Sequence, residues 1–339
     1  DDDVDDDDDG GGGGGDQSFL KKSWDNKRGE RPQCILNGSH RFADGLLHDE
    51  GREIGASLTH LDKQWFYATG IHHPDKNPDV ANKGLSIVPP RSALWLNALG
   101  DRMGPKPLVG YTDTSHIVDT ILQQPGQYSW QVLNWNIAIK ELAVSGCQYM
   151  TTFLKKNKLK LLWELVFGNR ALVKRLINES KDFVVANSLE ELASKMQELT
   201  KGEEHQINRG NFLKSVRDYD REVERGSTDD FQLERIKEFR GYRGDKFRIA
   251  RSQKIESDKA LPLIAIREFI LARKSLGGFE TNLSCEVLHE GDKTPIPGLY
   301  AIGEASGFGG GGIHGQRSLE GTFLGSCVLT GSRLAESLA

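Results

Sequence analysis

The residues best suited to chemistry stand near the C-terminus, around a glycine-rich loop. Glu304 follows a short apolar run at residues 299–302, which we expect to form a buried strand. The carboxyl end of such a strand is where ligands bind in open α/β sheets. In the glycines at 309–312, the backbone can approach a ligand without Cβ hindrance. His314 could transfer a proton near neutral pH, and Arg317 could hold a carboxylate or a ketone oxygen.

A helix is expected directly after this loop, from about Thr322, because apolar residues recur there at helical spacing. The first N–H groups of a helix have no partner within it, and the helix dipole places partial positive charge at that end. The backbone amides of Phe323 and Leu324 would therefore face negative charge on a ligand held in the loop.

The whole stretch at 298–325, GLYAIGEASGFGGGGIHGQRSLEGTFLG, resembles the C-terminal FAD-binding motif of a flavoprotein family. That family includes fumarate reductases, succinate dehydrogenase flavoprotein subunits and ketosteroid dehydrogenases, and the resemblance is greatest to its FAD-binding dehydrogenase branch. The resemblance implies FAD as the cofactor. It also implies that Glu304, in the pair Gly303-Glu304, accepts hydrogen bonds from cofactor hydroxyls. The amides at the helix start would stabilise charge on the reduced flavin.

The same resemblance gives candidate catalytic residues. Relatives place at Arg317 either an arginine that clamps a carboxylate or a tyrosine that polarises a ketone. Lys274 occupies the position of a histidine that lies beside the flavin in relatives, where it could hold negative charge; it could equally be a surface charge. His314 is either a proton-transfer group or a hydrogen-bonded loop residue.

Two further candidates lie in the first quarter of the chain. Asp44 stands where the family has a Thr-Gly-Asp-Gly turn that contacts the cofactor, although its position before a helical pattern also predicts a helix N-cap. His73 falls where several relatives have His-Pro-Thr, whose histidine binds a substrate carboxylate; here Asp75 replaces the threonine, and a plain loop residue is the alternative.

The resemblance implies an α/β fold: a Rossmann-like FAD-binding domain with an inserted α+β substrate or cap domain. The family's first nucleotide-binding segment, a strand followed by GxGxxG, is not found in this chain, so the domain is expected to be partial. We therefore expect this chain alone to bind FAD weakly or not at all. The predicted segments are an acidic and glycine-rich low-complexity tail (1–15), the first part of the FAD-binding domain (16–85), the cap (86–260) and the C-terminal part of the FAD-binding domain (261–339).

Patterns along the chain predict the elements that position these residues. Ser188 and Glu191 form a capping box for a helix to about residue 199. The basic segment 159–177 is expected to be a solvated cap helix and not a membrane anchor. Other expected elements are helices at 18–24 and 135–144, a hairpin at 86–103, a strand at 182–187 and a charged, solvated and mobile face at 203–257.

Composition excludes several functional classes. Of 339 residues, 37% are hydrophobic and 27% charged, as in a soluble globular protein. The formal net charge of −5 includes eight aspartates within residues 1–9, so the rest of the chain carries +3 and shows no nucleic-acid footprint. The four cysteines form no metal-binding spacing, which favours free thiols, no bound metal and a reducing cytoplasm. No secretory leader or membrane span is evident, because the most apolar run, 161–167, is short and contains Glu164.

These features together predict a FAD-dependent dehydrogenase that moves hydride from a C–H bond of a small, ketone-bearing substrate to flavin. One alternative is fumarate-type reduction of a carboxylate substrate, which is less favoured because the matching region at 114–116 has no arginine to serve as the acid. The other is a non-catalytic remnant of a flavoprotein. The sequence does not indicate the oligomeric state.

Overall fold

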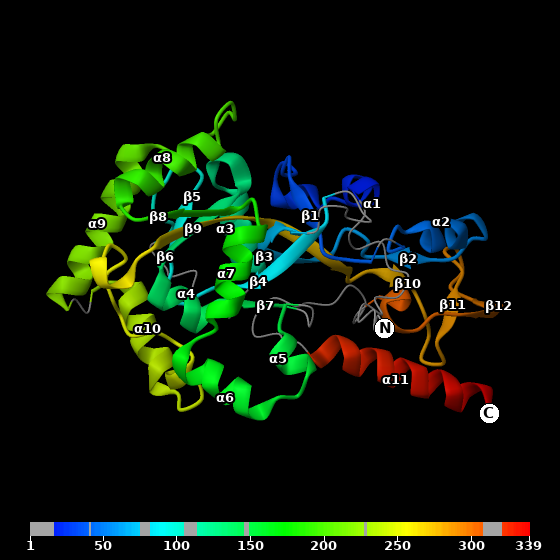
Figure 1. The fold of residues 1–339 in the computed structure, drawn as a ribbon. Coiled ribbons are helices and arrows are strands. Elements are labelled where there is room, and N and C mark those ends of the chain that lie inside the picture. Colours follow the sequence, from blue (N-terminus) through cyan, green and yellow to red (C-terminus); the bar gives the residue numbers. More distant parts are fainter. Residues whose placement is uncertain are drawn as a thin grey trace.

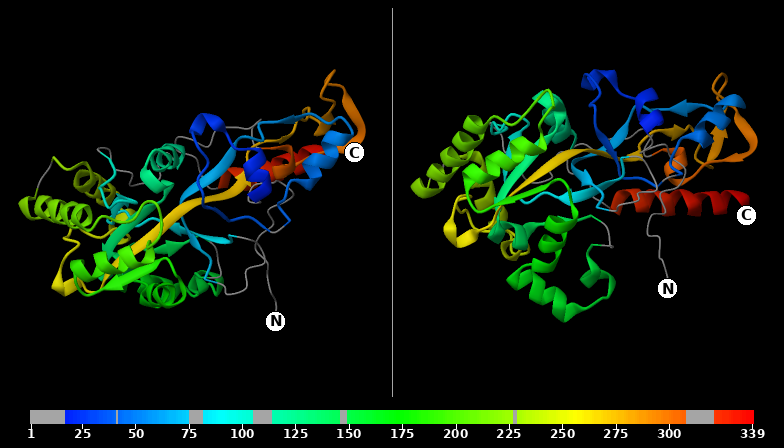
Figure 2. Two further views of the ribbon diagram at one scale, coloured as in Figure 1. Left: turned by 90° about the horizontal axis from the view of Figure 1, so that it is seen from above. Right: turned by 45° about the horizontal axis from the view of Figure 1, so that its top comes forward.

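The computed structural model describes residues 17–40, 42–74, 82–104, 114–145, 149–226, 229–307 and 321–339. Two lobes are joined by one long strand, β9 (Leu263–Ser275), which runs through both of them (Figures 1 and 2). The other strands are β1 (Ile35–Asn37), β2 (Leu58–Thr59), β3 (Gln64–His72), β4 (Gly84–Val88), β5 (Leu94–Asn97), β6 (Ser129–Asn134), β7 (Ala143–Val144), β8 (Phe183–Ala186), β10 (Gly278–Phe279), β11 (Glu286–Leu288) and β12 (Pro295–Tyr300). The α-helices are α1 (Gln17–Lys22), α2 (Leu46–Glu53), α3 (Thr114–Leu122), α4 (Trp135–Glu141), α5 (Thr151–Leu154), α6 (Lys158–Phe167), α7 (Arg170–Glu179), α8 (Leu189–Leu199), α9 (Arg209–Arg225), α10 (Phe231–Gly241) and α11 (Gly321–Leu338); η3 (Asp245–Phe247) and η5 (Gly303–Ser306) are 3-10 helices.

Strand β9 is the centre of a mixed sheet with the order β5-β6-β9-β3-β4-β7, to which β1 and β8 also pair through β9. In its first half, Ile264 lies opposite residues of the antiparallel strands β6 and β8. In its second half, Leu271 lies opposite residues of β3, which is antiparallel, and β1, which is parallel. The strand is apolar along most of its length and almost entirely buried, as expected where both faces of a sheet are covered.

Helices cover both faces of this sheet. On one face, α1 and α3 bury residues such as Leu20 and Val118 against Ile270 of β9. On the other face, a larger core forms under α4, α7, α8, α9 and α10. In β3, β5 and the second half of β9, apolar side chains alternate between the two cores, which is the period-two pattern of a strand between layers.

The second lobe is built from smaller units. The strand pairs β2–β10 and β11–β12 enclose a small core of Ala56, Phe279, Val287 and Ala301, and α11 packs along η5. Apolar side chains of α11, among them Val328 and Leu329, are exposed on its outer side. No helix in the described ranges combines the length and the apolar character needed to cross a bilayer.

The prediction of a buried strand at 299–302 was wrong. The strand here, β12, begins earlier, at Pro295, and ends at Tyr300; its residues are exposed or half-buried. It pairs with β11 in a two-stranded ribbon, and such a ribbon has no further strands to bury it. Glu304 consequently lies in η5 and not at the end of a sheet strand.

The prediction of one helix over 159–177 was also wrong, because α6 ends at Phe167, Gly168 follows it as the C-cap, and a new helix, α7, starts at Arg170. The side chain of Asn169 accepts a hydrogen bond from the backbone N–H of Leu172 (3.0 Å) and caps α7. The charged segment 203–257 is more ordered than expected: α9 and α10 bury residues such as Phe212.

Other predicted elements were confirmed. The Ser188 hydroxyl accepts a hydrogen bond from the N–H of Glu191 (3.1 Å) and caps α8. Of the hairpin predicted at 86–103, the turn forms, and the N–H of Asn97 donates there to the carbonyl of Asp101 (2.9 Å). The earlier residues belong to β4, which pairs with β3 and β7 and not with β5. The expected helices at 18–24 and after 322 are α1 and α11, the strand at 182–187 is β8, and the described cysteines are free thiols. The helix expected at 135–144 is α4, but it ends at Glu141, and residues 143–144 form β7.

Candidate functional site

The end of β9 contacts two of the predicted flavin-binding elements, Glu304 and the start of α11 at Phe323. The backbone N–H of Ser275, the last residue of β9, donates to Oε1 of Glu304 at 2.8 Å. Glu304 is only 7% exposed. A buried carboxylate is stable only where hydrogen bonds or charges compensate its lost hydration, so this bond fixes where the acid points.

One residue earlier on β9, Lys274 contacts the start of α11. Its Nζ lies 4.5 Å from the centroid of the Phe323 ring, a distance typical of a cation–π interaction. Phe323 is buried and meets Trp65 of β3 edge-on, with 5.7 Å between ring centroids. By contrast, the side chain of Leu324 is 71% exposed. The structure therefore brings Lys274 and Phe323 together and anchors the start of α11 on the sheet.

Two glycines allow the backbone of η5 to pack closely. Gly303 has φ +60°, and its N–H donates to Oγ1 of Thr330 on α11 at 3.0 Å. A Cβ on Gly278 of β10 would lie 2.3 Å from the carbonyl oxygen of Ala305, so only glycine fits there. Both contacts fix the position of Glu304 relative to β10 and α11.

The Asp44 prediction needs one correction. Asp44 is not the N-cap of α2; Gly45 is, and it makes no side-chain capping bond. Instead, Oδ1 of Asp44 accepts a hydrogen bond from the N–H of Leu46 (3.0 Å), the first residue of the helix. This is the geometry of an Asx turn, in which the short carboxylate of an aspartate accepts a hydrogen bond from the backbone N–H two residues later.

Sequence reasoning missed His48, four residues after Asp44. Its ring is buried edge-on against Phe279, and Nε2 lies 3.3 Å from the carbonyl oxygen of Ala305. Burial lowers the pKa of His48, and its Nδ1 makes no hydrogen bond with any described residue. Helix α2, and with it the Asp44 turn, is thereby held against η5. The only sequence signal was the helical spacing of His48 from Asp44.

His73 lies apart from this cluster. Its N–H donates to the carbonyl of Lys83 (2.9 Å), and its ring meets Tyr149 edge-on at 6.0 Å. Trp65, which pairs with Lys274, and His72 are seven residues apart on β3, or roughly 23 Å at strand spacing. The structure does not bring His73 and Lys274 together. His314, Arg317 and the side chain of Thr322 lie outside the described residues.

The donor set of the cluster fits the flavin and sugar part of FAD. A carboxylate such as Glu304 can accept about four hydrogen bonds, which suits cofactor hydroxyls. Lys274 supplies positive charge, and α11, with 18 residues, begins with backbone N–H groups that have no partner within the helix. In the part of the chain that the structure describes, no group of histidines, cysteines and acids could hold a metal ion.

Comparison with known proteins agrees with this chemistry. A KsdD-like steroid dehydrogenase of Mycobacterium tuberculosis is 39% identical over 315 residues, which are 92% of this chain and 55% of the relative. The chain thus spans about half the length of the curated relatives it matches.

Two solved structures share the fold. A 3-ketosteroid Δ1-dehydrogenase from Sterolibacterium denitrificans has a TM-score of 0.59 and 16% identity, over 95% of this chain and 51% of that one. The open conformation of a flavocytochrome c3 fumarate reductase has a TM-score of 0.57 and 18% identity, over 96% of this chain and 44% of that one. These likenesses confirm the predicted fold class. Residues 16–324 match the family described as FAD binding domain, and the chain therefore belongs to this family.

Proposed function

We propose that this chain forms the flavin-facing and substrate-facing part of a FAD-dependent dehydrogenase acting on a ketone-bearing, steroid-like substrate. The observation that carries the proposal is the junction at the end of β9, where Ser275 holds Glu304 and Lys274 meets Phe323. The steroid dehydrogenase relatives, 39% identical over most of the chain, support the substrate class. When bound, FAD supplies the acceptor for the hydride that leaves the substrate.

Each residue of the junction has a distinct part in the proposal. Glu304 accepts hydrogen bonds from cofactor hydroxyls. The backbone amides of Phe323 and Leu324, at the positive end of α11, would stabilise negative charge on the flavin. Lys274 adds a positive charge at the same end of the helix. Asp44 belongs to the turn that leads into α2, which His48 holds against η5.

The substrate side depends on residues beyond the junction. Arg317 is proposed to bind the ketone oxygen and His314 to take the proton that leaves with the hydride. His73 remains a candidate for a more distant substrate contact. Segments 16–85 and 261–339 are proposed as the parts of the FAD-binding domain, and 86–260 as the cap over the substrate.

The fumarate-type alternative has less support. A probable fumarate reductase of Shewanella frigidimarina is 23% identical over 296 residues. Residues 114–116 begin α3 as Thr-Ser-His, without the arginine that would act as the acid.

Anaerobic spectroscopy separates the candidate functions. The chain is saturated with FAD and mixed with a saturated-ring 3-ketosteroid; the proposed function predicts loss of the oxidised flavin absorbance. A fumarate-type enzyme would instead leave oxidised flavin unchanged and reoxidise pre-reduced flavin when fumarate is added. Flavin that binds but responds to neither compound would indicate a non-catalytic remnant and refute the proposed activity.

A titration tests the predicted weak cofactor binding separately. If the adenosine half of FAD has no binding site in this chain, titrations followed by quenching of flavin fluorescence should give similar, weak affinities for FAD and FMN. A stable yellow protein after purification, or a strong preference for FAD over FMN, would show that the expected weak binding is wrong. Lys274→Gln should lower the midpoint potential of the bound flavin. Lys293→Gln, at a lysine that is paired with Glu280, should leave it unchanged.

A further inference from the structure

Helix α6 exposes an unusual number of large apolar side chains. None of its ten residues is buried, and six of them are large hydrophobic residues exposed to solvent. Leu159 is 83% and Trp163 63% exposed. The exposed set, which we name the α6 patch, consists of Leu159, Leu162, Trp163, Leu165, Val166 and Phe167.

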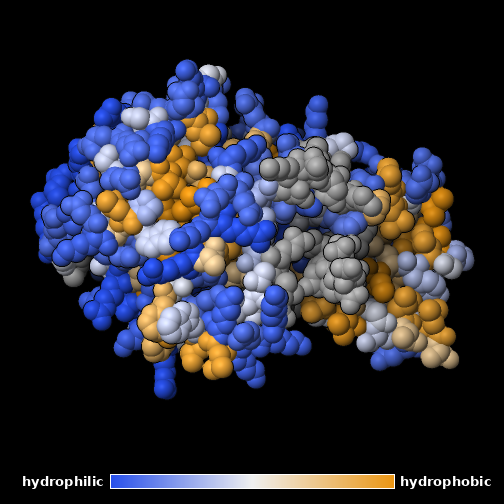
Figure 3. Space-filling model, viewed as in Figure 1, coloured by the Kyte–Doolittle hydropathy of each residue, from blue (hydrophilic) through white to orange (hydrophobic). Residues whose placement is uncertain are grey.

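The helix lies at the edge of the larger lobe, which contains α4 and α7–α10, and projects from it (Figures 1 and 2). Orange, hydrophobic atoms gather there at the lower edge of the space-filling view, beside blue, charged ones (Figure 3). A surface helix of a globular protein normally turns its apolar stripe towards the core. An apolar surface gathered on one exposed helix commonly marks an interaction site.

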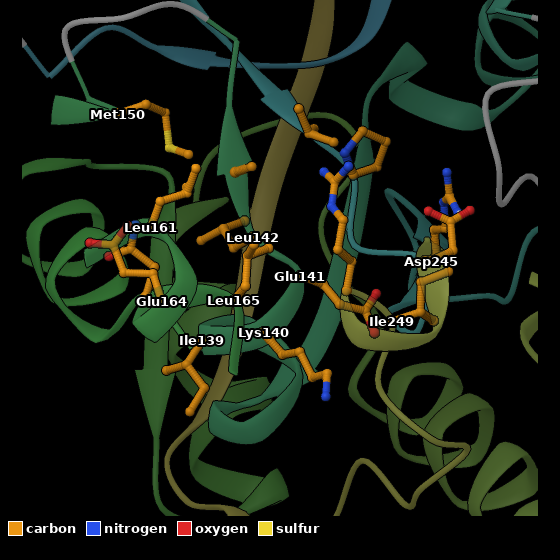
Figure 4. Close-up of a pocket in the computed structure, with 16 residues that line it drawn as sticks. Ile139, Lys140, Glu141, Leu142, Met150, Leu161, Glu164, Leu165, Asp245 and Ile249 are labelled. Carbon is orange, nitrogen blue, oxygen red and sulfur yellow. The ribbon is translucent and has the colours of Figure 1, made fainter. Parts of the chain in front are cut away.

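The inner side of α6 faces a cavity and not a packed core, so core packing does not explain why the helix is so apolar. Leu161 and Leu165 line a cavity of about 440 Å³ between α6, α4 and η3 (Figure 4). Glu164 accepts a hydrogen bond from Oγ1 of Thr152 at 2.8 Å and ties the helix to α5. The helix therefore lies over a hollow. Leu165 lines this hollow, and the other side chains of the α6 patch are exposed on the outer side of the helix.

The charges around the patch are almost all positive. Residues 155–175 contain seven lysines and arginines and one acid, Glu164. Lys155, Lys156, Lys158 and Lys160 are exposed at the start of α6. A surface that combines apolar and aromatic side chains with a dense positive charge complements an anionic lipid headgroup layer over an apolar interior.

We propose that α6 is an interfacial helix that lies in the headgroup layer of an anionic membrane. Ten helical residues are about 15 Å long, too short to span a bilayer but long enough to lie along its surface. Leu159, Leu162 and Val166 enter the acyl boundary, and Trp163, whose ring packs 4.2 Å from that of Phe167, sits at the level where aromatic rings favour the interface. The lysines contact lipid phosphates. This role is independent of the proposed enzymatic activity.

Co-sedimentation of the full chain with vesicles tests the proposal. The probes are phosphatidylcholine vesicles, alone and mixed with an equal part of phosphatidylglycerol. The chain should sediment with the mixed vesicles and not with pure phosphatidylcholine, and raising the salt concentration should weaken binding.

Two variants separate the apolar and the charged contributions. Lys158→Gln/Lys160→Gln should weaken binding by roughly 25-fold, about fivefold for each charge removed. Leu162→Ser/Trp163→Ser should abolish it. Matched controls outside the helix are Leu283→Ser, at an 85% exposed leucine, and Lys201→Gln/Lys214→Gln, at two exposed lysines. Both controls should bind like the wild type.

The outcomes are decisive once circular dichroism shows that the variants are folded. Absence of binding to the phosphatidylglycerol vesicles would overturn the proposal, as would equal losses in variants and controls. Sedimentation velocity covers the remaining explanation: if the wild type self-associates and Leu162→Ser/Trp163→Ser does not, while neither binds vesicles, a second copy covers the α6 patch and the membrane role is wrong.

Discussion

The buried carboxyl group of Glu268 allows a direct test of how the core around β9 is packed. It lies on β9 with no exposed surface, and neither carboxyl oxygen has a hydrogen-bond partner among the described residues. Burial raises the pKa of Glu268 well above its ordinary value of 4.5. The folded protein therefore keeps this carboxyl protonated at a pH at which the unfolded chain has already ionised.

The sign of the effect follows from proton binding. Below pH 4.5 both states hold the proton, and the ionisation of Glu268 does not affect stability. Above it, the unfolded state binds fewer protons than the folded state, so the free energy of unfolding falls by about 1.36 kcal/mol per pH unit until the folded pKa is reached.

Glu268→Gln removes the ionisation and nearly keeps the shape. Urea denaturation followed by tryptophan fluorescence should show variant and wild type changing equally below pH 4.5. Above pH 4.5, the variant should gain stability relative to the wild type by about 1.36 kcal/mol per pH unit until the folded pKa is reached. Glu280→Gln is a control of opposite sign, because hydrogen bonds from Lys293 and Ser57 lower the pKa of Glu280. Parallel pH profiles for wild type and Glu268→Gln would refute the burial of an uncompensated carboxyl in β9.

Three further predictions concern packing and capping. Phe323→Ala should lower the free energy of unfolding by about 3–5 kcal/mol in urea melts, because a buried ring is lost. Leu324→Ala, at an exposed neighbour, should change it by less than about 0.5 kcal/mol. Similar losses in the two variants would contradict the anchoring of α11. Ser188→Ala should cost about 1 kcal/mol in the same assay, and no loss would argue against the cap on α8. Burial lowers the pKa of His48 from 6.5, so the stability of the fold should fall as the pH drops below 6.5. His48→Gln should reduce that fall in thermal melts between pH 7 and 5. An unchanged pH profile would mean that the histidine is solvated.

Local signals in the sequence predicted local structure well. Ser188 followed by Glu191 predicts a helix start from hydrogen bonds within four residues. The Ser188 hydroxyl accepts from the N–H of Glu191 as expected, and the Glu191 carboxylate accepts from the N–H of Asn187. The helix after residue 322 follows likewise from apolar spacing along the chain. In each case the deciding interactions lie within the segment itself.

Interactions between distant segments were not predictable in the same way. The run at 299–302 has the composition of a buried strand, yet β12 is half-exposed because its partner is a single short strand. Gly168 ends α6 inside a continuous apolar pattern, and Asn169 then caps α7. The burial of Glu268 depends on layers supplied by α3 and the neighbouring strands, which no single segment reveals.

The site shows the same division. The motif around Glu304 pointed to the acid, and the structure places it in the core with a defined partner. That β9 connects Glu304 through Ser275 and Phe323 through Lys274 depends on pairing between segments about thirty to fifty residues apart. The position of His48 in the site could not be predicted from the sequence, because it depends on contacts with the distant residues Phe279 and Ala305.

The central claim is that the end of β9, η5 and the start of α11 together form the flavin face. Hydrogen–deuterium exchange with and without saturating FMN measures this directly. The account predicts slower exchange at the amides of residues 274–278, 303–307 and 321–325, with no change in α8 or α9. Flavin fluorescence quenching accompanied by protection only elsewhere, or by none in these three segments, would contradict it.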